Sequence, residues 1–137
     1  MTRRLAADEA LIYAMVTTSA VDRAIADSEL DRIGSIVRQL PAFTTYDKDW
    51  LADEAQACGR VLAGASGLDK VLDLIRDALP PHLRETAYVL AAEVAATDMK
   101  VKVEESRFLE LLADKLEIEP LVAAALERAA KARHQLV

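Results

Sequence analysis

The chain has 137 residues, and its 17 Lys and Arg are outweighed by 23 Asp and Glu, which gives a net charge of −6. This length fits one domain that can fold without disulfides, and the acidic balance argues against nucleic acid as a partner, because phosphate backbones are bound by basic patches. No uninterrupted apolar run reaches the ~18 residues of a membrane-spanning helix, so we expect no direct membrane insertion.

The first third of the chain predicts a helical hairpin. Residues 6–21 are apolar almost all round, which on a helix means burial on several sides, so this helix should be central. After a turn at Asp22, apolar residues recur at helical spacing up to about residue 40. Pro41 should end that second helix, since proline cannot continue the hydrogen-bond ladder.

The middle of the chain, about residues 47–79, predicts two more helices joined by a short Gly-Ala-Ser-Gly connection at residues 64–67. The inward stripe of the first should comprise Trp50, Leu51, Ala55, Cys58, Val61 and Leu62. The second should bury Leu68, Val71, Leu72, Ile75 and Leu79. Neither stripe has a counterpart elsewhere in the chain, so this pair is predicted to be a helical insert.

Three further helices are predicted at about residues 81–97, 104–116 and 120–133. The first is again apolar nearly all round and should be the second central helix, with Glu93 as its one unusual residue and Arg84 or Arg107 as the expected partner. The last helix should turn Val122, Ala125, Leu126 and Ala129 inward. Its basic end, formed by Arg128, Lys131, Arg133 and His134, suits the helix dipole and is interpreted as solvated.

An internal repeat relates the two central helices. Asp22, Ile25 and Glu29 follow the pattern Asp-x-x-[Ile/Val]-x-x-x-Glu, and Asp98, Val101 and Glu105 repeat it 76 residues later. We therefore predict one all-α domain spanning residues 1–137, a compact bundle of about seven helices with pseudo-twofold symmetry between hairpins. The repeat halves are residues 9–40 and 85–116, the insert is 47–79, and the C-terminal helix is 120–133.

These doubled features resemble the TerB-like family, named after tellurite resistance protein B. The resemblance covers about residues 9–129 and implies an all-helical fold, a role in tellurite resistance and other stress responses, and acidic turns connected with divalent cations. The chain departs from the family at Arg23 and Met99, which replace the glycine that usually follows the motif aspartate. Lys100 and Lys102 also stand inside the second copy, so the first copy is the better candidate for an ion.

The acidic turns allow two interpretations. In one, carboxylates collect Ca²⁺ or Mg²⁺, which prefer oxygen ligands, and the candidate metal ligands are Asp22, Asp27, Glu29, Asp31, Asp98 and Glu105. In the other, the aspartates form the turns and the glutamates complement the start of the next helix. The loop is not an EF-hand, because Ala24, Ala26 and Ile33 occupy ligand positions of such a loop. We favour the structural interpretation, since Asp and Glu are common at helix starts.

Catalytic motifs are absent from the sequence. Two histidines and one cysteine do not make a zinc ligand set, and no phosphate-binding loop occurs. The lone Cys58 falls at an interior helical position, which favours a reduced, cytoplasmic protein. The leading hypothesis is a noncatalytic stress-response module with protein partners or a homodimeric state. The alternatives are an ion-free structural interaction domain and an enzyme using carboxylates such as Asp22 with Glu29.

Overall fold

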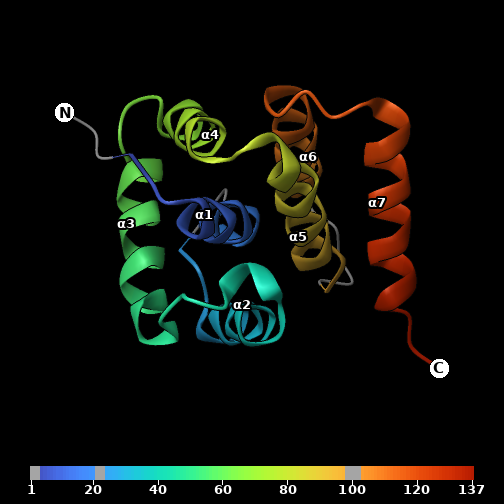
Figure 1. Cartoon of the computed structure of the whole chain (residues 1–137), viewed down its shortest axis with the longest axis horizontal. Helices are drawn as coiled ribbons and strands as arrows, with labels where there is room; N and C mark the ends of the chain where they lie inside the picture. Colours follow the sequence, from blue (N-terminus) through green and yellow to red (C-terminus); the bar gives the residue numbers. More distant parts are fainter. Residues whose placement is uncertain (1–3, 21–23, 98–102) are drawn as a thin grey trace.

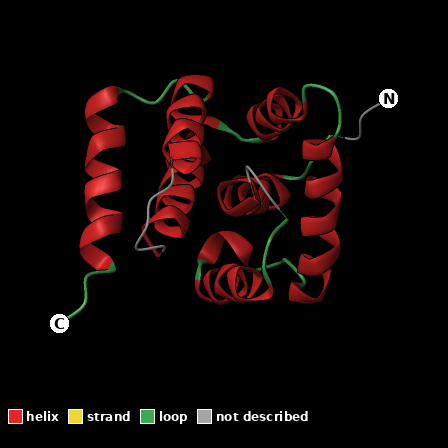
Figure 2. Cartoon of the chain, turned by 180° about the vertical axis from the view of Figure 1, so that it is seen from behind, coloured by secondary structure: helices red, strands yellow, loops and turns green. Residues whose placement is uncertain are grey.

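The computed structural model describes residues 4–20, 24–97 and 103–137, and within them the fold is all-α, as predicted (Figures 1 and 2). Seven α-helices lie in these ranges, together with three short 3₁₀ turns. The helices are α1 (Ala7–Ala20), α2 (Asp27–Gln39), α3 (Leu51–Ala63), α4 (Gly67–Ala78), α5 (Arg84–Thr97), α6 (Val103–Lys115) and α7 (Pro120–Arg133). The 3₁₀ turns are η1 (Pro41–Phe43), η2 (Lys48–Trp50) and η3 (Pro81–Leu83).

Helix α1 occupies the centre of the bundle. All its residues from Glu9 to Ser19 are buried, and it contacts α2, α3, α4, α5 and α6 (Figure 1). Two of its buried hydroxyls have partners: the Thr18 hydroxyl donates to the Ala14 carbonyl at 2.8 Å, and the Thr17 hydroxyl lies 3.4 Å from the Cys58 sulfur. The prediction that this helix is central and buried on several sides is confirmed.

Helix α5 is the second central element, and it separates α1 from α7. It contacts both of them, and α7 lies at the outer edge of the molecule in both views (Figures 1 and 2). The prediction that the two Ala-rich helices touch is confirmed. Ala87, Ala91 and Ala95 on α5 are buried, and such small side chains allow neighbouring helices to approach closely.

The predicted inward face of α7 was partly wrong. Ala125 and Ala129 are exposed, whereas Ala123 and Ala130 are buried and Leu126 is half-buried. Helix α7 packs mainly on the single helix α5, so only a narrow stripe at spacings of three, four and seven residues is covered. In an Ala-rich helix the apolar residues do not by themselves define that stripe.

The repeat is visible in the helix bounds. Helix α6 begins 76 residues after the start of α2 and ends 76 residues after the end of α2. Helix α5 begins 77 residues after the start of α1. Ile33 and Leu109 occupy equivalent positions on α2 and α6, and both are buried. Superposition of the two hairpins by a pseudo-twofold rotation stays a prediction.

Trp50 does not join the buried stripe of α3. It ends the 3₁₀ turn η2, before α3 begins, and 54% of its surface is exposed. Its ring instead meets the edge of Tyr46, with ring centroids 5.9 Å apart and planes at 88°. The prediction failed because a 3₁₀ turn has three residues per turn, so Trp50 is rotated away from the face that Leu51, Ala55 and Cys58 share.

Glu93 has a different partner from the two that were expected. Its carboxylate accepts from the Arg133 guanidinium at 2.5 Å, and His134 lies 3.8 Å away. The Glu93 side chain is only 12% exposed, so an arginine that reaches it from the end of α7 offsets the cost of covering its charge. The expectation of Arg84 or Arg107 was wrong, and the basic end of α7 helps to fasten that helix to α5.

Candidate functional site

The predicted metal ligands that the structure describes lie at the starts of α2 and α6. Glu29 is the third residue of α2, and its carboxylate accepts from the Ala26 amide at 3.1 Å. Glu105 is the third residue of α6 and is buried, with 4% exposed. Asp27 and Asp31 are exposed on α2. Asp22 and Asp98 lie outside the described residues.

The contact made by Glu29 is one half of a capping box. A glutamate at the third helical position reaches back to an amide that the helix leaves unsatisfied, and its negative charge suits the positive end of the helix dipole. Helix α1 uses the same device, because Glu9 accepts from the Ala6 amide at 2.9 Å. The structural role predicted for Glu29 is therefore present in this structure.

A preformed metal cluster is not seen in the described part of the chain. Within residues 4–20, 24–97 and 103–137, no group of three or more His, Cys, Asp or Glu side chains is placed to hold a metal ion. Asp27, Glu29 and Asp31 alone therefore do not form a site. The six-residue ligand set stays a prediction, since it includes Asp22 and Asp98.

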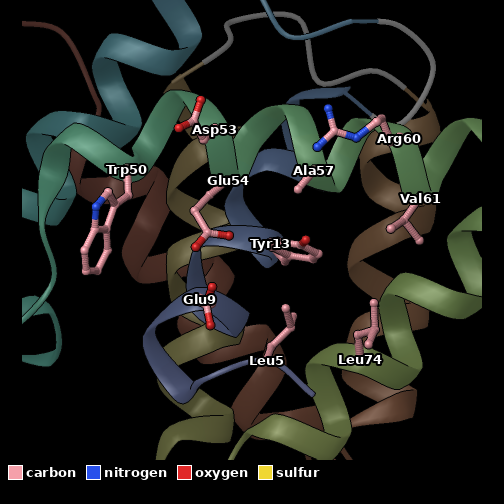
Figure 3. A pocket seen from close by; sticks show the side chains of 10 residues that line it. All are labelled: Leu5, Glu9, Tyr13, Trp50, Asp53, Glu54, Ala57, Arg60, Val61 and Leu74. Atoms are coloured by element: carbon pink, nitrogen blue, oxygen red, sulfur yellow. The ribbon is translucent and has the colours of Figure 1, made fainter. Parts of the chain in front are cut away.

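A concave feature lies elsewhere, between α1, α3 and α4 (Figure 3). This cavity has a volume of about 620 Å³, which is within the range of ordinary ligand pockets. We call it the α1–α3 pocket. Its apolar wall comes from Leu5, Val61 and Leu74, and its charged lining comes from Glu9, Asp53, Glu54 and Arg60.

Two helices bring the carboxylates of the α1–α3 pocket together. Glu9 enters from the first turn of α1 and is only 8% exposed, while half-buried Glu54 comes from the first turn of α3 (Figure 3). Asp53 lies beside Glu54 and is exposed, as is Arg60 nearly two turns further along α3. Three carboxylates therefore share the pocket with one guanidinium, and its lining is acidic.

Aromatic side chains complete the pocket. Tyr13 lies on α1 next to Glu54, and exposed Trp50 forms the rim on the other side of Glu54 (Figure 3). Tyr46, which does not line the pocket, makes an edge contact with the Trp50 ring; it is buried, and its hydroxyl has no hydrogen-bond partner within the described residues. Burial raises the pKa of Tyr46 most, and the charges of Glu54, Asp8 and Glu9 raise it further, so this hydroxyl faces an acidic environment.

Arg4 and Leu5, which precede α1, are fixed beside α4 by a defined contact. The Arg4 guanidinium donates to the Asp77 carbonyl at the C-terminal end of α4, at 2.7 Å and 3.2 Å. Because Leu5 follows directly, this bond fixes one apolar wall of the cavity. Sequence reasoning missed the pocket, since its residues come from three helices, although the acidic pairs Asp8-Glu9 and Asp53-Glu54 were visible as helix-start signals.

A family model for tellurite resistance protein TerB matches residues 8–134. The chain belongs to the TerB family. The match includes both acidic turns, the helical insert and α7, so this TerB domain uses nearly all of the sequence. No curated protein and no solved structure gives a significant match to the chain. None of the helices in the described residues is both long and apolar enough to cross a bilayer.

Proposed function

We propose that this TerB domain is a noncatalytic helical module of tellurite and stress resistance, which acts in the cytoplasm by binding other proteins. The family match over residues 8–134 carries the proposal. Support also comes from the only cysteine, Cys58, which is buried and reduced against Thr17, as suits a reducing compartment.

The resistance role can be tested in a bacterial host from which this gene has been deleted. Restoring the gene should raise the tellurite concentration that the cells tolerate, and restoring a variant that cannot fold, such as Leu90→Asp, should not. Tolerance to a second oxidative stress should be measured in parallel. Equal tolerance of both stresses with and without the gene would contradict the proposal.

The proposal has two forms, which differ in whether the first acidic turn holds a divalent cation. In the ion-binding form, Asp22, Asp27 and Asp31 supply oxygen ligands for Ca²⁺ or Mg²⁺. In the ion-free form, the turn is only structural. The bond from the Ala26 amide to Glu29 supports a structural role for that glutamate, so the ion-binding form depends chiefly on the aspartates.

Asp22→Asn separates the two forms, because asparagine keeps the oxygen that forms a turn but loses the charge that a hard cation requires. If Asp22 is a ligand, added Ca²⁺ or Mg²⁺ should raise the melting temperature of the wild type but not of Asp22→Asn. Asp69→Asn, in the exposed first turn of α4, is the matched control and should respond like the wild type. An equal response in all three proteins would exclude Asp22 as a required ligand.

An enzymatic activity is the second candidate function, because the side chains of Glu9 and Glu54 line one cavity, the α1–α3 pocket. We still favour binding, since Glu9 accepts the Ala6 amide and so already caps the start of α1. A screen with ester, phosphate ester and glycoside substrates tests this choice. Turnover that disappears in Glu54→Gln would overturn the noncatalytic part of the proposal.

A further inference from the structure

We propose that α7 exchanges between two copies of the chain, so that the α7 of each copy packs on the α5 of the other and a symmetric dimer forms. The inference goes beyond the proposed function, because it concerns how two copies of this domain assemble. It rests on the narrow attachment of α7, on the specific polar contacts beneath it and on the strained turn that precedes it.

The attachment of α7 to the bundle is narrow. This helix lies at the outer edge of the molecule and packs mainly on α5 (Figures 1 and 2). Its buried residues are two alanines, Ala123 and Ala130, whereas α4 buries Val71, Leu72 and Ile75. Hydrophobic stabilisation grows with the apolar area removed from water, so separating α7 from the bundle costs less free energy than separating a helix such as α4.

The polar contacts beneath α7 are specific. On α5, the Tyr88 hydroxyl donates to the Glu127 carboxylate, and Glu93 accepts from the Arg133 guanidinium at 2.5 Å, with His134 at 3.8 Å. Tyr88 is 2% exposed and the Glu93 side chain 12%, so both groups are covered and find these partners on α7. Any other occupant of this face would have to supply an acceptor and a cation at the same spacing. The α7 of a second copy supplies both, which commits the surface to that occupant.

The turn between α6 and α7 is short and strained. Residues 116–119 connect the two helices, and Glu117 has a φ of 57°, in the left-handed region. That conformation disfavours a residue with a Cβ atom by roughly fivefold or more in population. The Ile118 amide donates to the Ala113 carbonyl at 2.9 Å, a helix end at which glycine is usual at the position of Glu117. Opening this turn therefore releases strain, and an exchanged dimer opens it twice.

The exchange leaves the contacts between α5 and α7 unchanged, because each α5 is covered by an identical helix. The monomer and the dimer therefore differ mainly at the turn. Opening it also breaks the ion pair between Arg76 and Glu117, whose side chains are 41% and 63% exposed, and so exposed a pair contributes little. Since association costs translational and rotational freedom, the monomer should dominate in dilute solution and the dimer at high protein concentration.

The ion pair between Glu93 and Arg133 allows a direct test by charge reversal. Glu93→Lys places two cations between α5 and α7, and Arg133→Glu places two anions there, so each variant alone has like charges with or without exchange. An exchanged dimer of one variant with the other pairs opposite charges at both interfaces. The two variants are checked for folding by circular dichroism, mixed at high concentration and incubated until their distribution is constant. Light scattering after gel filtration and native mass spectrometry then identify the dimers.

The mixture should form the mixed dimer with an association constant at least about tenfold above that of either variant alone, because like charges are removed from both interfaces. The matched control carries Glu93→Lys and Arg133→Glu in one chain, which restores opposite charges within it. This control should dimerise like the wild type but should not form mixed dimers with it. No mixed dimer from the two folded single variants, or free mixing of the control with the wild type, would overturn the inference. So would a wild type that stays monomeric at millimolar concentration.

A second pair of variants tests the turn and keeps the charges of α5 and α7 unchanged. Glu117→Gly removes the strain from the monomer and should lower the dimer association constant by about tenfold. Glu119→Gly is the matched control, since the φ of Glu119 is −59° and glycine relieves no strain there. If both glycine variants dimerised equally well, the turn would not drive the exchange, and the inference would be wrong.

Discussion

The close approach of α3 and α4 makes a strong prediction about Gly67. A Cβ atom at this position would stand 2.2 Å from the Leu62 carbonyl oxygen and 2.5 Å from that of Val61. Both are backbone atoms of the last turn of α3, so no side-chain rotation can relieve the clash. Gly67→Ala should therefore force the two helices apart, since a Cβ atom essentially never lies within 3.0 Å of another heavy atom.

Overpacking of this kind costs about 1–3 kcal/mol, occasionally more, which is a large fraction of the ~5–15 kcal/mol that stabilises a typical domain. Gly59→Ala is the matched control. Gly59 lies within α3, and a Cβ there would meet nothing within 4 Å, so the higher helix propensity of alanine should stabilise the protein by about 0.5–1 kcal/mol.

Urea unfolding followed by far-UV circular dichroism measures both effects. The two alanine variants should move the unfolding midpoint in opposite directions, with little change in the slope of the transition. If Gly67→Ala were as stable as Gly59→Ala, α4 could not begin against the last turn of α3, and the described connection between these helices would be wrong.

Three other variants test the centre of the bundle, its outer edge and its buried thiol. Leu90→Asp should abolish the cooperative melting transition, because it places a charge at a position with 2% exposure on α5; a cooperative melt would mean that α5 is peripheral. Arg133→Ala should lower the free energy of unfolding, measured in urea, by about 1–2 kcal/mol, since the mostly covered Glu93 carboxylate loses its bond from the Arg133 guanidinium. Arg128 is exposed on α7, so Arg128→Ala is the control and should change stability by less than about 0.5 kcal/mol. Burial raises the pKa of the Cys58 thiol to about 12. Between pH ~8.5 and ~10 the unfolded chain therefore loses this proton while the folded protein keeps it. The free energy of unfolding should fall over this range, by up to about 1.4 kcal/mol for each pH unit. Cys58→Ala should show a shallower fall over that pH range, and identical slopes would contradict the burial of the thiol.

The helices could be predicted because their signals are local. Pro41, residues 64–67 and Pro120 mark ends or starts within a few residues of those observed, and the nearly continuous apolar runs at residues 10–16 and 88–96 identified both central helices. Burial on several sides leaves no polar face in the sequence, so the position of a helix at the centre can be inferred from its composition alone.

The contacts that depend on relative placement could not be predicted. The partner of Glu93 comes from α7, and which arginine reaches it depends on how α7 lies on α5. The face of α7 was misjudged for the same reason, since alanines occur all round that helix. The α1–α3 pocket combines residues from three helices and the segment before α1, and no spacing within one segment indicates such a site.

The acidic residues of the repeat divide into two groups with different physical roles. Glu29 and Glu105 hold the third position of their helices, and Glu9 holds the same position in α1, where a carboxylate can accept an amide that the helix leaves unsatisfied. That role needs only one nearby amide and no ion, so a glutamate at this spacing is explained by helix formation alone. We therefore expect any cation response of this TerB domain to be weakened more by substitutions at Asp22 and Asp98 than by substitutions at the glutamates that follow them.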